Sequence, residues 1–205
     1  MSRLLRAGAR SSPSTARNRE PILAVLRETL PPDARVLEVA SGAGEHAVFV
    51  AEHLLDAAWL PTDPDPEALA SIAAWREASD LPNLAPPRRL DVTDQAAWPA
   101  GPFDAVVCIN MIHIAPWTAA EALVAGAARV LQPGGVLFLY GPYLEDGVET
   151  APSNVAFDAD LRRRNPGWGL RPLEDVTALA ARHDLVFVRR VAMPANNLSV
   201  IFARA

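Results

Sequence analysis

Nearly continuous apolar segments alternate with amphipathic segments along most of the 205-residue chain. The strands are expected at 35–40, 57–63, 87–92, 103–110 and 135–143, and the helices at 18–30, 45–55, 65–78, 118–131 and 173–183. A strand that is apolar along its whole length is buried on both faces, whereas a half-exposed antiparallel strand alternates apolar and polar residues. The pattern therefore predicts a parallel sheet with helices covering both faces.

The end of the chain departs from this alternation. Two further strand-like segments, 184–194 and 197–205, are joined by a connection too short for a parallel crossover, so we expect an antiparallel hairpin. The predicted fold is α/β: a Rossmann-like, mostly parallel sheet of seven strands with helices on both faces and a C-terminal antiparallel hairpin. Residues 1–15, rich in arginine and serine, are expected to be a flexible tail, and 16–205 a single domain.

Residues 143–170 interrupt the alternation with a polar segment rich in turn-forming residues. Long insertions in compact domains are often lids over a site, so we expect a mobile lid here. The alternative is an ordered surface excursion that only packs against the domain.

The composition limits the chemistry of the chain. All nineteen basic residues are arginines, which excludes Schiff-base lysines, the lysine of a phosphate-binding loop and the Tyr-Lys pair of dehydrogenases. The net charge of -5 and the scattered arginines lack the basic footprint of a nucleic-acid binder. The single Cys108 allows neither an internal disulfide nor a cysteine metal site. We expect a cytoplasmic protein without a metal, a nucleic-acid partner or a membrane segment; its oligomeric state stays open.

A small-residue loop, "GAGEHA", follows the first expected strand and opens a helix. It matches the dinucleotide-binding pattern G-x-G-x-x-A, and Asp63 follows at the distance of a ribose-binding acid. Glu38 lies inside the strand, where an unpaired carboxylate costs several kcal/mol, so a partner at the end of the strand is expected. Ala40, two residues before this pattern, lies where one of the cofactor families that use such a loop usually has its first glycine, and its methyl group is tolerable if its φ is negative.

Several segments resemble motifs of the class I S-adenosylmethionine-dependent methyltransferases: "VLEVASGAGEH", "PTDPDP", "RLDVTD" and "VLQPGGVLFL". At a finer level, "STARNREPIL", "INMIHIAPW", "LYGPY", "TAPSN" and "MPANNLS" are similar to a small methyltransferase-like family shared by bacteria and animals. The resemblance covers nearly the whole chain. It implies S-adenosyl-L-methionine as the cofactor and methylation of a small-molecule acceptor on oxygen or nitrogen.

The resemblance also implies which residues would contact the cofactor: Asn18, Glu38, Ser41, Gly42, Gly44, Asp63, Asp91, Val92, Asn110, Met111 and Ile112. Asp63 would accept the two ribose hydroxyls, although an Asp-Pro sequence also suits a helix cap. Asp91 would accept the adenine amino group, although a turn is an alternative role for this residue. Met111 and Ile112 would line the cofactor or belong to the core.

Methyl transfer requires alignment, a dry pocket and, for a hydroxyl acceptor, a base. The candidate catalytic residues are His113 and Tyr143 as bases, with Glu145 as a further candidate base, and Asn154 as an orienting group; packing is the alternative role for His113. Two other functions stay open. A protein that binds S-adenosylmethionine without catalysis fits the same motifs, whereas the missing lysine and the terminal hairpin count against a nicotinamide-dependent oxidoreductase.

Overall fold

The computed structural model describes residues 8–11 and 13–205. Seven strands form one sheet in the order β3-β2-β1-β4-β5-β9-β8. They are β1 (Arg35–Val39), β2 (Ala58–Asp63), β3 (Arg88–Arg89), β4 (Phe103–Ile109), β5 (Leu131–Gly141), β8 (Leu185–Met193) and β9 (Asn197–Arg204). Strands β1 to β5 run parallel, and β9 is antiparallel to both β5 and β8. The predicted fold class and the C-terminal hairpin are confirmed.

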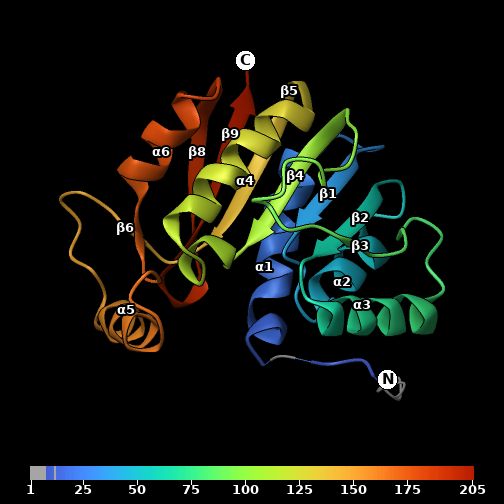
Figure 1. Ribbon diagram of the computed structural model, residues 1–205, viewed down its shortest axis with the longest axis horizontal. Helices are drawn as coiled ribbons and strands as arrows, with labels where there is room; N and C mark the ends of the chain where they lie inside the picture. Colours follow the sequence, from blue (N-terminus) through green and yellow to red (C-terminus); the bar gives the residue numbers. More distant parts are fainter. Residues whose placement is uncertain (1–7, 12) are drawn as a thin grey trace.

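Helices cover both faces of the sheet (Figure 1). They are α1 (Pro13–Thr29), α2 (Glu45–His53), α3 (Pro66–Ser79), α4 (Trp117–Val130), α5 (Pro152–Arg164) and α6 (Leu173–Ala181), with short 3-10 turns η1 (Met111–His113) and η2 (Pro194–Asn196). Helices α1 and α2 belong to one apolar core, and α4 and α6 to the other. A two-residue strand pair, β6 (Tyr143–Leu144) with β7 (Arg171–Pro172), lies outside the main sheet.

The two cores explain why the strands are apolar along their length. In β1, Val36 packs into the core of α1 and α2, whereas Leu37 packs into the core of α4 and α6. Both side chains are fully buried. Because successive side chains of a strand point to opposite faces, a sheet with two covered faces needs apolar residues at successive positions.

Two boundaries differ from the sequence-based expectation. Helix α1 begins at Pro13, not at Asn18, so Asn18 is an interior helical residue and the expected tail boundary at residue 15 lies inside the helix. Residues 143–170 contain the helix α5, which was not expected. Only Asn154 and Leu161 of α5 are buried, so the segment has no apolar periodicity from which a helix could be read.

The strand order reverses between β1 and β4, since β2 and β3 lie on one side of β1 and β5 lies beyond β4. In open α/β sheets, ligands bind outside the carboxyl ends of the strands at such a switch point. Helix α5 lies to one side of the sheet, covering neither face (Figure 1). Within the described residues, no helix combines the length and the apolar character needed to cross a bilayer.

Candidate functional site

The glycine loop connects β1 to α2 at the switch point. Ala40, Gly42 and Gly44 all have left-handed backbones, with φ of 56°, 57° and 89°. The expectation of a negative φ for Ala40 is therefore wrong, and its methyl group carries a strain of about 1–2 kcal/mol. A cross-strand hydrogen bond fixes the following residue, because the N–H of Ser41 donates to the carbonyl oxygen of Thr62 over 2.9 Å. The loop is thus tied to β2 in this strained shape.

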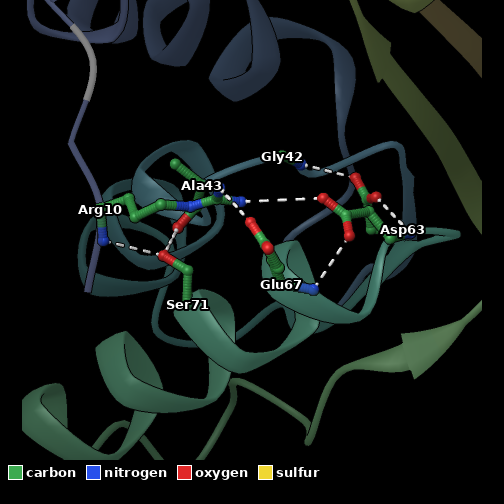
Figure 2. A network of polar contacts seen from close by, with 7 residues as sticks. Arg10, Gly42, Ala43, Asp63, Glu67 and Ser71 are labelled. Atoms are coloured by element: carbon green, nitrogen blue, oxygen red, sulfur yellow. Dashed lines mark hydrogen bonds and ion pairs between the residues drawn. The ribbon is translucent and has the colours of Figure 1, made fainter. Parts of the chain in front are cut away.

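Asp63 ends β2 and holds the glycine loop from the other side (Figure 2). Its Oδ2 accepts a hydrogen bond from the N–H of Gly42 over 2.9 Å, and its Oδ1 accepts one from the N–H of Asp65 over 3.0 Å. Burial raises the pKa of Asp63 above its usual value. The N-cap of α3 is Asp65, whose carboxylate accepts from the N–H of Glu67 over 3.0 Å, so the alternative role of a cap falls to Asp65.

The chain ahead of α1 lies against α3 beside the glycine loop (Figure 2). The N–H of Arg10 donates to Ser71 Oγ over 2.9 Å, and Ser71 Oγ donates to the carbonyl oxygen of Ala43 over 2.8 Å. Trp75 Nε1 donates to the carbonyl oxygen of Arg10 over 2.9 Å. Part of the expected tail, at Arg10, is therefore docked on the domain, whereas residues 1–7 and 12 lie outside the described part of the chain.

Glu38 finds its partner on the neighbouring strand. Its Oε2 accepts a hydrogen bond from Trp59 Nε1 over 2.8 Å, and the residue is 1% exposed. Burial raises the pKa of Glu38 to about 7. We expected this partner at the end of the strand. It is instead an indole of the core, because Glu38 shares a sheet face with Val36 and points toward α1 and α2.

An apolar cavity of about 270 Å³ opens at the carboxyl ends of β1, β2 and β4. It is lined by Val39, Ala40, Pro64, Leu90, Asp91, Val92, Met111, Ile114, Ala115 and Ala119. Three expected cofactor residues, Asp91, Val92 and Met111, meet here. Asp91 Oδ1 also accepts hydrogen bonds from the N–H and the hydroxyl of Thr93, over 2.9 and 2.7 Å, so Asp91 does stabilise the turn. Ile112, 3% exposed, belongs to the core.

A polar cavity of about 440 Å³ adjoins the apolar cavity and shares Ile114 with it. Its lining comes from α1, the ends of β4 and β5, α5 and the connection between η2 and β9: Asn18, Asn110, Ile114, Tyr140, Pro142, Ser153, Asn154, Phe157, Ala195 and Asn197. Two expected cofactor residues, Asn18 and Asn110, thus lie in one cavity with Asn154, an expected catalytic residue.

A hydrogen-bonded chain underlies one wall of the polar cavity. His46 Nε2 and Asn18 Oδ1 lie 2.8 Å apart, and the Asn18 side chain also hydrogen-bonds to Tyr140. Burial lowers the pKa of His46 to about 4, so its imidazole is neutral at pH 7 and Nε2 donates to the Asn18 oxygen. Sequence reasoning missed Tyr140, although its place at the end of an apolar strand was a usable signal.

His113 and Tyr143, expected as bases, are buried away from this cavity. Both ring nitrogens of His113 and the hydroxyl of Tyr143 lack a hydrogen-bond partner among the described residues. Burial, followed by the Arg171 charge, lowers the pKa of His113 to about 3, and burial raises the pKa of Tyr143. Their rings pack edge to face with centroids 5.0 Å apart. The packing alternative for His113 describes this structure, and neither residue lines the polar cavity.

Arg171, which the sequence did not single out, connects the site to the segment after α5. Its Nε donates to the carbonyl oxygen of Ile112 over 3.0 Å. Its Nη2 donates to the carbonyl oxygens of Ala115 and Gly167 over 2.7 and 2.8 Å. Arg171 therefore holds the turn after β4, which lines both cavities at Ile114. Within the described residues, no three metal-ligating side chains gather into a metal site.

Comparisons with known proteins agree with this architecture. A family model described as "Protein of unknown function (DUF938)" matches residues 9–204. A tRNA (guanine-N(7)-)-methyltransferase of Nitrobacter hamburgensis is 32% identical over 110 residues, which are 48% of this chain and 41% of that protein. Among solved structures, an O-methyltransferase family protein from Burkholderia thailandensis has a TM-score of 0.77 at 18% identity, covering 91% of this chain and 56% of that one.

A second solved structure, the S-adenosylmethionine-dependent methyltransferase SibL, has a TM-score of 0.78 at 19% identity and covers 93% of this chain and 55% of that one. The chain thus spans less than two thirds of the length of each of these three proteins. At these identities, the solved structures establish the methyltransferase fold.

Proposed function

We propose that this chain, a member of the DUF938 family, is an S-adenosylmethionine-dependent methyltransferase that acts on a small-molecule acceptor. One observation carries the proposal. An apolar cavity with room for a nucleobase, the buried carboxylate of Asp63 hydrogen-bonded to a strained glycine loop, and a polar cavity lie at the carboxyl edge of the sheet near the switch point. A dinucleotide needs room for a second base, whereas the second cavity here is lined by amides and hydroxyls and suits an amino acid end and an acceptor.

The residues present fit the cofactor. The adenine ring would lie in the apolar cavity, with the Asp91 carboxylate at its rim to accept the amino group. The ribose hydroxyls would reach Asp63, which already faces hydrogen-bond donors with both oxygens. The methionine end would lie between the glycine loop and Asn18. S-adenosylmethionine supplies a methyl group on a positively charged sulfur, and the thioether sulfur is a leaving group that needs no protonation.

The glycine loop contributes shape more than free donors. The N–H groups of Ser41, Gly42 and Gly44 already donate to Thr62, Asp63 and Ser41, respectively. These three N–H groups are therefore already engaged within the protein. Their hydrogen bonds instead set the loop in its left-handed shape ahead of ligand binding, which lowers the ordering cost of binding.

The polar cavity holds the residues that would position the acceptor. No acid, arginine or histidine is among its lining residues, so the chain offers orientation and exclusion of water, with no strong base in direct contact. Asn154 is 7% exposed, and its Nδ2 donates to the carbonyl oxygen of Asn196 over 2.9 Å. We assign Asn154 the orienting role, and we do not propose His113 or Tyr143 as bases.

Calorimetry tests the cofactor assignment. We expect S-adenosylhomocysteine to bind with micromolar affinity, about 8 kcal/mol, and to raise the melting temperature. No heat and no thermal shift at saturating ligand would refute the proposal. Binding without release of S-adenosylhomocysteine from S-adenosylmethionine, in a screen of metabolites, would favour the non-catalytic alternative. Saturable quenching of the protein's fluorescence in a titration with NADH would favour the nicotinamide alternative.

A further inference from the structure

The acceptor side of the polar cavity is formed by α5 and by the turn before β9. Ser153, Asn154 and Phe157 come from α5, and Ala195 and Asn197 from the turn. None of these side chains is ionisable. Among the described residues that line the polar cavity, Tyr140 alone has a titratable group, and burial raises its pKa, so it is neutral at pH 7. The cavity therefore presents no charge of its own to a ligand.

Two amides on this side have fixed orientations. Asn154 Nδ2 donates to the carbonyl oxygen of Asn196 over 2.9 Å. Asn197 Nδ2 donates to the carbonyl oxygens of Pro194 and Ala195, over 3.0 and 3.2 Å. Asn197 Nδ2 donates twice to the backbone and Asn154 Nδ2 donates once, so the group that each side chain chiefly has left for a ligand is its Oδ1, a hydrogen-bond acceptor. The matching group on a ligand is a donor, O–H or N–H.

The lining of the polar cavity also includes apolar residues, one of them with an aromatic ring: Ile114, Pro142, Phe157 and Ala195. Phe157 is 40% exposed although it lines the cavity, and Ile114 is 44% exposed at the junction with the apolar cavity. The ion pair of Glu145 Oε2 with Arg190 Nε, at 2.5 Å, lines a neighbouring cavity that shares Asn154 and Asn197 with the polar cavity, and its two charges compensate each other. On the side of the polar cavity that α5 lines, away from Asn18, a charged group of an acceptor would lose water without gaining an opposite charge.

We propose that the methyl acceptor is a small, uncharged molecule with a flat apolar body and an O–H or N–H group, which the Oδ1 atoms of Asn154 and Asn197 accept. The flat body would lie against Phe157. This inference rests on the proposed function. It names the acceptor class that the lining of the cavity selects.

Three probes of matched size test the charge preference: benzyl alcohol, benzylamine and benzoate, each titrated at pH 7 into the full chain saturated with S-adenosylhomocysteine. Ligand-observed NMR measures the Kd. We expect saturable binding of benzyl alcohol and at least about tenfold weaker binding of both charged probes. Equal or tighter binding of either charged probe, or no saturable binding of benzyl alcohol, would overturn the inference.

Charge substitutions in the cavity give the second arm. Asn154→Asp, or Asn197→Asp if the first variant does not fold, should shift the preference toward benzylamine by about tenfold or more, since a carboxylate then faces the probe. Asn165→Asp is the matched control, because Asn165 ends α5 outside the cavity and its Oδ1 already accepts from the N–H of Gly167 over 2.9 Å. An equal shift in the control would refute a role of the cavity amides.

The two levels of the proposal fail separately. Absence of S-adenosylhomocysteine binding in calorimetry removes the methyltransferase assignment itself. If S-adenosylhomocysteine binds and the three probes bind alike, the methyltransferase assignment stands and the acceptor class is wrong.

Discussion

Replacing Asp63 by alanine separates the two tasks of this carboxylate. In the free protein, its oxygens accept the N–H groups of Gly42 and Asp65 over 2.9 and 3.0 Å. Hydrogen bonds to a charged group contribute about 1.5–3 kcal/mol each to stability, and the raised pKa of Asp63 shows that burial opposes its charge. We therefore expect Asp63→Ala to lower the free energy of unfolding by about 2 kcal/mol, measured by urea denaturation.

Asp63→Ala should also weaken binding of the cofactor, because two ribose hydroxyls lose a charged acceptor in a largely desolvated pocket. The expected loss is about 2–3 kcal/mol, or about a 30- to 150-fold increase in the Kd of S-adenosylhomocysteine. Calorimetry under conditions where the variant is folded measures this change directly. An affinity equal to that of the wild type in a folded Asp63→Ala protein would refute the assignment of the ribose site.

Asp65→Ala is the control for general damage to this corner of the fold. It removes the N-cap of α3, whose carboxylate accepts the N–H of Glu67 over 3.0 Å, and should cost about 1 kcal/mol of stability. Its Kd for S-adenosylhomocysteine should stay within about twofold of the wild type.

Lowering the pH should weaken binding of S-adenosylhomocysteine to the wild type, since the raised pKa of Asp63 means that its carboxylate is protonated at a higher pH than an ordinary aspartate.

Three further predictions concern stability and motion. Glu38→Gln should stabilise the protein by about 3 kcal/mol at pH 8 and by little below pH 4.5. The pKa of Glu38 is about 7 in the folded protein against an ordinary value of 4.5, so the ionised carboxylate destabilises the fold increasingly as the pH rises through this interval. Equal effects of the substitution in urea denaturation at both pH values would contradict this. Gly44→Ala should cost about 2 kcal/mol or more because a Cβ would lie 2.9 Å from Ile72 Cγ1 at a φ of 89°, whereas Gly134→Ala, at a φ of 78° with open space, should cost about 1 kcal/mol. We also propose that residues 143–170 form a lid: their amides should gain protection from hydrogen exchange when S-adenosylhomocysteine and benzyl alcohol are both present, and equal protection with and without ligands would exclude closure.

The sheet could be predicted from the sequence because its residues alternate between two covered faces. The apolar segments at β1, β4 and β5 have no other packing that buries them. Helix α5 could not be predicted, since its buried residues are one amide, Asn154, and one leucine, Leu161. Its position depends on a tertiary contact, the hydrogen bond from Asn154 to η2, that leaves no periodic signal.

The site divides in the same way. The positions of Asp63, Asp91 and Met111 at the carboxyl edge could be predicted, because each residue ends a strand or follows one, and sequence motifs encode that position. His113 and Tyr143 shared that position, but their side chains turn into packing contacts, which depend on neighbours far away in the chain. The partner of Glu38 was missed for the same reason, because it lies on β2.

The contacts of Arg171 bear on how this protein can change over evolution. One guanidinium joins the turn after β4 to the segment after α5 through three carbonyl oxygens, those of Ile112, Ala115 and Gly167. A change in the length of either segment would break the geometry of the other, so insertions are constrained there. Phe157 of α5 is 40% exposed and lines the polar cavity but not the apolar cavity, so a substitution there would leave the apolar lining intact. New acceptor preferences would therefore arise most readily by point substitution along α5.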